Sequence, residues 1–419
     1  MGEKNLLKIQ GYAPWLCGDT SAQLLGSVKN FVFPLVCLTL TGSPVQAGLV
    51  ATSGIISEGI FDFIGGLHAD KRNRVGILLF SSIFGLFISG FLLFWEIIFH
   101  NVLFVILLLV NILISARLGY SSSASTSALV DIVPDKKLGA ALSANQVRDS
   151  SISLAGGPLG GILLACGLNI VYLFMFLLES LATVFNMVLF RKHGKEYINN
   201  SGVSEEESGW KNIFAGFRWI LSSKGISFTL ISSTLVSFSV SSFITVNIYS
   251  MQIGEKSYQE IGFFSTSVGA GMLLGSLVSN LILNRFNFRA ISVSVFLLIG
   301  AQLFLSALVD SYYVNIINSF LIFLLIPSLN VGLMTYLILL VPGNLMGRVN
   351  SAASLINLSS SSLSPLFAGL VLYFFSRSLV LICCFILVVL ALGFALMNKQ
   401  LMGMPRQENW SSYLKGQAC

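Results

Sequence analysis

The 419-residue chain is 55% hydrophobic and only 10% charged, with a formal net charge of +6. Soluble domains carry about 25% charged residues, so a soluble protein of this composition would have nowhere to place its apolar surface. The composition excludes an ordinary soluble enzyme or binding domain and predicts a protein that crosses a membrane several times.

Twelve stretches are apolar enough to span a bilayer, which takes about 20 residues each. They cover residues 15–40, 47–67, 75–98, 102–130, 140–166, 168–191, 225–250, 258–283, 289–309, 312–340, 349–375 and 376–397. The sequence therefore predicts an all-α membrane protein with twelve transmembrane helices.

The basic residues gather in alternate connections and at both ends of the chain. Lys256 and Arg377 fall in connections on the opposite side. By the positive-inside rule, both termini are expected in the cytoplasm and the protein in the plasma or inner membrane. This bias accounts for the positive net charge, so no nucleic acid partner is expected.

The residue types that form metal sites are scattered. His68, His100 and His193 lie far apart, and the six cysteines lie within spans or at the C-terminus without a Cys-x-x-Cys spacing. No nucleophile–base pair and no Gly-x-x-x-x-Gly-Lys-(Ser/Thr) loop is recognisable. We expect neither a metal, a cofactor nor an enzyme activity.

A repeat divides the chain. The segment 133–139, Val-Pro-Asp-Lys-Lys-Leu-Gly, returns as Val-Pro-Gly-Asn-Leu-Met-Gly at 341–347. Such a duplication is typical of transporters built from two related six-helix bundles. We expect a bundle at 1–191, a cytoplasmic linker at 192–224, a second bundle at 225–397 and a cytoplasmic tail at 398–419. Within the linker, apolar residues recur at helical spacing from about Gly209, which predicts an amphipathic helix on the inner leaflet.

Ionisable residues inside a bilayer are functional candidates, because burying them is costly. The first half holds Asp19, Lys29, Glu58, Asp62, Arg117, Arg148, Asp149 and Glu179. Our hypothesis is that Arg117 or Arg148 tunes the proton affinity of Glu58 or Asp149, and that one carboxylate exchanges a proton with substrate; Asp19 is a third candidate. The alternative is a set of structural ion pairs that locks the first bundle.

The connection between the second and third spans carries the sharpest motif. It reads Gly65-Gly66-Leu67-His68-Ala69-Asp70-Lys71-Arg72-Asn73-Arg74. A glycine here allows close helix packing, an acid can cap a helix or pair with Arg, and the basic residues hold the loop at the anionic inner surface.

This loop resembles the signature of the major facilitator superfamily, Gly-x-x-x-Asp-(Arg/Lys)-x-Gly-Arg. Gly66, Asp70, Lys71 and Arg74 match it. Asn73 replaces the second glycine, and we expect it to adopt a left-handed turn. The resemblance implies that this loop is a conformational switch between two six-helix bundles.

Shorter segments resemble the branch of that superfamily that holds macrolide-efflux and enterobactin-exporter proteins. They are Leu40-Thr41-Gly42-Ser43-Pro44, Ala116-Arg117-Leu118, Ala144-Asn145, Gly157-Pro158-Leu159-Gly160-Gly161 and the segment 214–221. The stretch with Gly157, Pro158 and Gly161 also resembles the antiporter motif of drug:proton exchangers. A proline there bends the helix and glycines allow close contact, which suits either a moving hinge or a plain packing kink.

Together these features predict a membrane transport protein, and three functions fit them. The first is a monomer that exports amphiphilic small molecules (a drug, a macrolide-like compound or a secreted siderophore) by proton antiport. The second is an importer of the same fold. The third is a channel or a non-catalytic membrane subunit.

Overall fold

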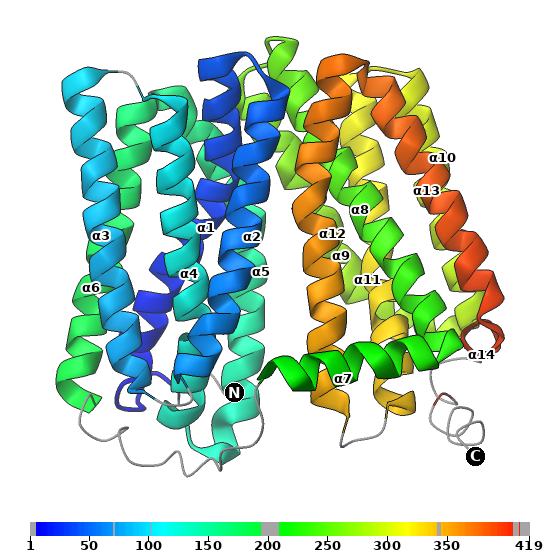
Figure 1. Cartoon of the computed structure of the whole chain (residues 1–419), viewed down its shortest axis with the longest axis horizontal. Helices are drawn as coiled ribbons and strands as arrows, with labels where there is room; N and C mark the ends of the chain where they lie inside the picture. Colours follow the sequence, from blue (N-terminus) through cyan, green and yellow to red (C-terminus); the bar gives the residue numbers. More distant parts are fainter. Residues whose placement is uncertain are drawn as a thin grey trace. The chain divides into compact units, whose positions relative to one another are not determined.

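The computed structural model describes residues 6–69, 72–100, 102–193, 209–341, 345–404 and 410. Within those residues the secondary structure consists of helices, joined by short turns (Figure 1). The chain divides into two compact units: unit 1 is Met1–Ser204 with Lys256–Phe263, and unit 2 is Glu205–Glu255 with Phe264–Cys419.

Six long helices and the first turns of a seventh form unit 1. They are α1 (Tyr12–Thr41), α2 (Pro44–Ala69), α3 (Arg74–Phe99), α4 (Phe104–Ile132), α5 (Asp135–Cys166), α6 (Leu168–His193) and the start of α9 (Tyr258–Arg285). Unit 2 holds α7 (Gly209–Ser222), α8 (Lys224–Ile253), the rest of α9, α10 (Phe288–Leu308), α11 (Tyr312–Leu340), α12 (Met346–Phe374), α13 (Arg377–Met397) and α14 (Lys399–Met402).

Each of the twelve predicted spans coincides with one of these long helices, and the predicted all-α membrane fold is confirmed. Eleven helices in the described part of the chain are long and apolar enough to cross a bilayer. The remaining one, α5, is the most polar because its first half carries Arg148 and Asp149. It also begins earlier than expected, at Asp135, since Pro134 precedes it and proline favours a helix start.

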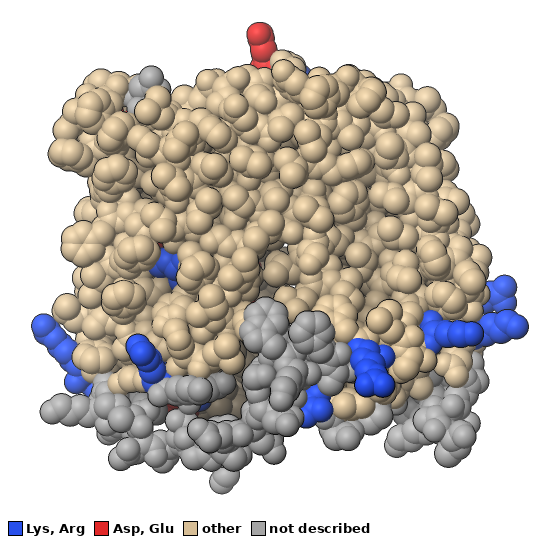
Figure 2. Space-filling view, viewed as in Figure 1, with Lys and Arg blue, Asp and Glu red and all other residues tan. Residues whose placement is uncertain are grey.

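Most of the exposed charge lies near one end of the helices. In each unit, most Lys and Arg atoms drawn in Figure 2 lie near one end of the helices, and uncharged surface covers their middle portions. Large apolar side chains such as Phe80 and Phe87 are exposed there, at 67% and 72%. Exposed phenylalanines on the middle of a helix are what a lipid-facing surface requires.

Glycine allows α2 and α4 to touch along their backbones. A Cβ atom on Gly65 would lie 2.3 Å from the carbonyl oxygen of Tyr120, and one on Gly119 would lie 2.0 Å from the carbonyl oxygen of Glu58. Small residues at such contacts are the usual means by which membrane helices approach closely. The contact fixes the backbone of Glu58 against α4.

Gly65 and Gly66 make a matched pair for testing this contact. We expect Gly65→Ala to lower the free energy of unfolding by about 1–3 kcal/mol, because its methyl group would overlap backbone atoms that cannot move aside. Gly66→Ala should have little effect, because its Cβ would lie 3.5 Å from Ser123 Oγ, an ordinary contact. Thermal unfolding of the purified variants in one detergent measures both; equal melting temperatures would contradict the prediction.

Unit 2 is held together by uncharged polar groups around one buried cation. Arg377, at the start of α13, donates hydrogen bonds of 2.9 Å to Asn247 Oδ1, 2.9 Å to Asn315 Oδ1 and 2.8 Å to the carbonyl oxygen of Ser306. Its ion-pair partner Asp310 is 3.3 Å away and 73% exposed. These bonds join α8, α10, α11 and α13, so we assign Arg377 to the scaffold.

Candidate functional site

A cavity of about 220 Å³ lies within unit 1 among α1, α2, α4 and α5. Its lining is mostly polar: Asp19, Ala22, Gln23, Gly26, Ser27, Asn30, Glu58, Leu118, Ser121, Ser122, Asp149, Ile152 and Ser153. All three predicted proton-coupling carboxylates, Asp19, Glu58 and Asp149, line this one cavity. They come from three different helices, α1, α2 and α5.

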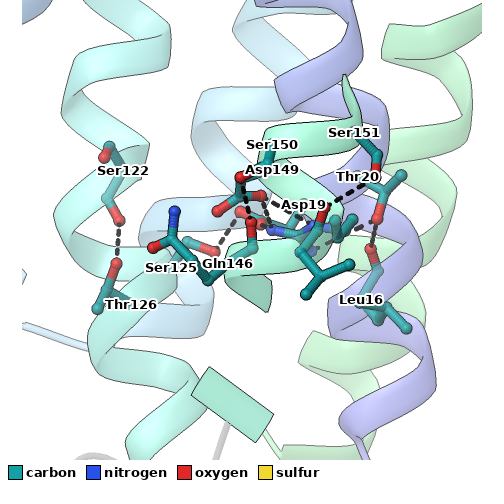
Figure 3. Close-up of polar contacts among 12 residues, drawn as sticks. Leu16, Asp19, Thr20, Ser122, Ser125, Thr126, Gln146, Asp149, Ser150 and Ser151 are labelled. Atoms are coloured by element: carbon teal, nitrogen blue, oxygen red, sulfur yellow. Dashed lines mark hydrogen bonds and ion pairs between the residues drawn. The ribbon is translucent and has the colours of Figure 1, made fainter. Parts of the chain in front are cut away.

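One guanidinium holds two of these carboxylates (Figure 3). Arg148 forms an ion pair with Asp19 of α1, and its Nη2 lies 2.8 Å from Oδ1 of Asp149. The guanidinium also lies over the ring of Trp15, 5.6 Å from its centroid. On the α4 side, Ser125 donates a 2.5 Å hydrogen bond to Asp19. Asp19 and Asp149 therefore share a cation, and Asp19 is held from α4 as well.

Glu58 has a different environment. It has no hydrogen bond and no ion pair with any residue that the structure describes. The cation whose charge acts on it is Lys29, in the middle of α1. Lys29 is 0% exposed and donates its hydrogen bond to Ser115 of α4. One turn further along α2, Asp62 accepts a 2.7 Å hydrogen bond from Ser123.

Arg117 belongs to a separate buried ion pair. It binds Glu179 of α6, and the two side chains are 2% and 0% exposed. A Cβ atom on Gly85 of α3 would lie 2.5 Å from Glu179 Oε1 and 2.6 Å from Arg117 Nε, so the glycine makes room for the pair. Beside it, Arg117 lines a small space of about 20 Å³ together with Asp19.

Of the arginine–carboxylate pairs expected from the sequence, the structure contains the ion pair between Arg148 and Asp149. It places neither arginine in contact with Glu58. The reason is geometric: Arg117 faces α3 and α6, whereas Glu58 faces α1 and the cavity. For Arg117, the structural ion pair is the interpretation that the geometry favours.

The residues around Arg74 tie three helix ends together. Arg74 Nη1 lies 2.7 Å from both carboxylate oxygens of Asp131, at the end of α4, and Nε donates to the carbonyl oxygen of Ala69, at the end of α2. Gly66 lies inside the last turn of α2. Asp70 and Lys71 fall outside the described residues, so the switch role of the loop stays a prediction.

The expected conformation of Asn73 is wrong. Its φ is −62° and its ψ is 109°, an extended backbone, and its side chain accepts a 3.0 Å hydrogen bond from the amide of Gly76. Asn73 is thus the N-cap of α3, a position that asparagine favours strongly. Capping satisfies an amide that a glycine would leave without a partner.

The antiporter-like residues pack against the first turns of α9, inside unit 1. A Cβ atom on Gly161 would lie 2.5 Å from the carbonyl oxygen of Tyr258, and one on Gly262 would lie 3.1 Å from that of Gly157. Pro158 lies within the continuous helix α5. Nearby, Thr39 Oγ1 of α1 and the hydroxyl of Tyr258 are 3.0 Å apart. The glycines therefore provide a close helix contact.

Sequence reasoning did not select Ser115 or Trp15, and it gave no specific role to Lys29 or Ser125. Lys29 stood out as a charge inside a span, but its partner lies on another helix. Trp15 and Ser125 are ordinary residues of membrane helices. Their role is visible only in the structure, where the indole N–H of Trp15 donates a 3.1 Å hydrogen bond to Ser125 and Ser125 binds Asp19. Among the described residues, no three His, Cys, Asp or Glu side chains are grouped as a metal site would require.

Comparison with known proteins identifies the family. The profile of the Major Facilitator Superfamily matches residues 20–365. No curated protein sequence matches the chain significantly. Among solved structures, a bacterial homologue of the iron transporter ferroportin in an inward-facing state is similar with a TM-score of 0.72 and 16% identity, over 94% of this chain and 99% of that one.

Two further structures show the same fold. The nucleoside transporter NupG has a TM-score of 0.70 and 11% identity, over 93% of this chain and 100% of that one. A bacterial homologue of the human lysosomal transporter Spinster has a TM-score of 0.67 and 14% identity, over 96% and 98%. At these identities the similarity concerns the fold. Since the family profile covers most of the chain, the protein belongs to the major facilitator superfamily of membrane transporters.

Proposed function

We propose that this protein exports amphiphilic small molecules by proton antiport, with the Lys- and Arg-rich ends of its helices in the cytoplasm. The observation that carries the proposal is the cavity in unit 1, where Asp19, Glu58 and Asp149 meet from three helices. Ionisable groups within a membrane bundle that face a cavity are the usual elements of proton relays in transporters. Within unit 2, no helix contains an Asp or Glu; this includes α7, α8 and the part of α9 that follows Phe264. The carboxylates available for coupling are therefore concentrated in unit 1.

Glu58 is the carboxylate best suited to carry the proton. Asp19 and Asp149 are both bound to Arg148, so protonation of either carboxylate would break an ion pair. Glu58 lines the same cavity without a hydrogen-bond partner among the described residues, so a proton can reach it and leave it without breaking an ion pair. Asp149 is the second candidate, because its side chain is 43% exposed and shares Arg148 with Asp19.

The charge of the cavity favours basic substrates within the amphiphilic class. Its three lining carboxylates face two cations, Arg148 and Lys29, so one negative charge remains when all are ionised. Complementary charge gives specificity and suppresses partners of the same sign. We therefore favour macrolide amines and lipophilic cations over catecholate siderophores, with the cationic group of the substrate in this cavity.

The test uses inside-out membrane vesicles that carry the protein, acidified by respiration and observed with a pH-sensitive dye. Macrolides, lipophilic cations and catecholate siderophores are added one at a time. We expect basic compounds to release protons from the lumen and anionic siderophores to give no response. Vesicles without the protein are the control.

Two outcomes would contradict the proposal. Radiolabelled substrate that accumulates without proton release would show transport that is not coupled to protons. Uptake into right-side-out vesicles, driven by an inward proton gradient, would show an importer of the same fold.

A further inference from the structure

Lys29 is a fully buried cation that forms no ion pair with any residue that the structure describes. It is 0% exposed, lies in the middle of α1 and donates a hydrogen bond to the hydroxyl of Ser115, which is itself 0% exposed. An ammonium group removed from water is costly unless an opposite charge compensates it. A serine hydroxyl supplies a dipole and no charge, so the charge must be compensated elsewhere.

The packing around Ser115 indicates that the compensating negative charge comes from α2. A Cβ atom on Gly54 would lie 3.2 Å from Ser115 Oγ, so the hydroxyl that holds Lys29 lies directly against α2 at Gly54. Glu58 follows Gly54 by one helical turn and shares its face of α2. Lys29 is thus anchored about one turn away from Glu58, and each acts on the other's charge.

The other charged groups around the cavity already have partners. Asp19 and Asp149 bind Arg148, Asp62 accepts from Ser123, and Arg117 binds Glu179. These are the ionisable side chains on α1, α2, α4 and α5 that surround Glu58 within the membrane-spanning part of unit 1. Among the described residues, Lys29 remains as an ammonium without an ion pair, and Glu58 and Asp62 remain as carboxylates without one. Glu58 is one helical turn from Gly54, and Asp62 lies a further turn away along α2.

We propose that Lys29 is a positioning residue for proton exchange at Glu58, a role that rests on the proposed function for its biological meaning. When Glu58 releases its proton to the cavity, the ammonium of Lys29 stabilises the carboxylate. When Glu58 takes up a proton, the ammonium stays with Ser115. The exchange moves one proton, between the Glu58 carboxyl group and water.

The first test titrates Glu58 directly, in purified protein, and does not require transport. Infrared difference spectra are recorded across a pH series, and the carboxyl band that Glu58→Gln removes reports the protonation of Glu58. In Lys29→Met we expect the midpoint of this band to move to higher pH by about one unit or more, because the carboxylate loses the cation that stabilises it. Lys29→Arg should restore a midpoint near that of the unsubstituted protein.

A second variant, Ser115→Ala, should move the midpoint of the Glu58 band in the opposite direction. Without the hydroxyl, the ammonium has Glu58 as its remaining partner, so the midpoint should move to lower pH. Ser81→Ala is the matched control, because Ser81 is a buried serine that donates to the carbonyl oxygen of Arg117 instead. Unchanged midpoints in both Lys29→Met and Ser115→Ala would overturn the inference.

A transport assay then separates this inference from the proposed function. Substrate-driven proton release in Lys29→Met vesicles should show a pH profile displaced in the same direction as the infrared midpoint. If the infrared midpoint moves but no compound drives proton release in the unsubstituted protein, the Lys29–Glu58 pair stands and the antiport function fails. If antiport is measured but the midpoint and profile do not move, the role of Lys29 fails alone.

Discussion

Glu58→Gln is expected to abolish substrate-driven proton release while the protein still folds and binds substrate. Glutamine has the shape of glutamate but cannot carry the proton, and Glu58 has no hydrogen bond with a described residue that the change would break. The measurement is the vesicle assay with the pH-sensitive dye, together with binding of a radiolabelled basic compound to the purified variant. We expect the dye response to fall to the level of vesicles without the protein.

Asp62→Asn is the matched control for this experiment. Asp62 lies on the same helix one turn away, but its carboxylate accepts a hydrogen bond from Ser123 and does not line the cavity. Its variant should keep most of the dye response. A full response from Glu58→Gln would move the proton-carrying role to Asp149, whose asparagine variant is the next to measure.

Arg117→Met is expected to destabilise unit 1 by about 3–5 kcal/mol, because it leaves the Glu179 carboxylate buried without its partner. Glu179 is 0% exposed, so water does not compensate the charge. Thermal unfolding in detergent measures the loss. The double variant Arg117→Met/Glu179→Leu should recover most of it, since no buried charge then remains.

A partly exposed ion pair supplies the comparison. The Arg74 and Asp131 side chains are 24% and 25% exposed, so Arg74→Ala should cost about 1 kcal/mol or less. If Arg117→Met and Arg74→Ala lower the melting temperature equally, the burial argument for the Arg117–Glu179 pair is wrong.

The sequence predicted the helices well because a membrane-spanning helix can be recognised from the length and composition of its apolar stretch. It also narrowed the candidate site, since charges inside spans are few and costly. It did not predict which charges meet: Asp19 and Arg148 are 129 residues apart, and Arg117 and Glu179 are 62 apart. Whether such residues face each other depends on the rotation of each helix about its axis, which packing decides.

The two neighbouring glycines of the loop motif illustrate the same limit. Gly65 and Gly66 differ by about 100° around α2, and only Gly65 faces the backbone of α4. The family signature draws attention to Gly66, but the close contact belongs to its neighbour. Asn73 is a similar case, because the signature suggested a left-handed turn where the chain needed a helix cap.

The backbone contact between Glu58 and Gly119 has a consequence for how the transporter works. Helices that interlock at a carbonyl group and a glycine cannot slide past each other without separating, so α2 and α4 must travel as one body. Glu58 then stays at a fixed depth within that body throughout the cycle. If Glu58 carries the proton as proposed, access to its carboxyl group must change through movement of the helices that surround this pair.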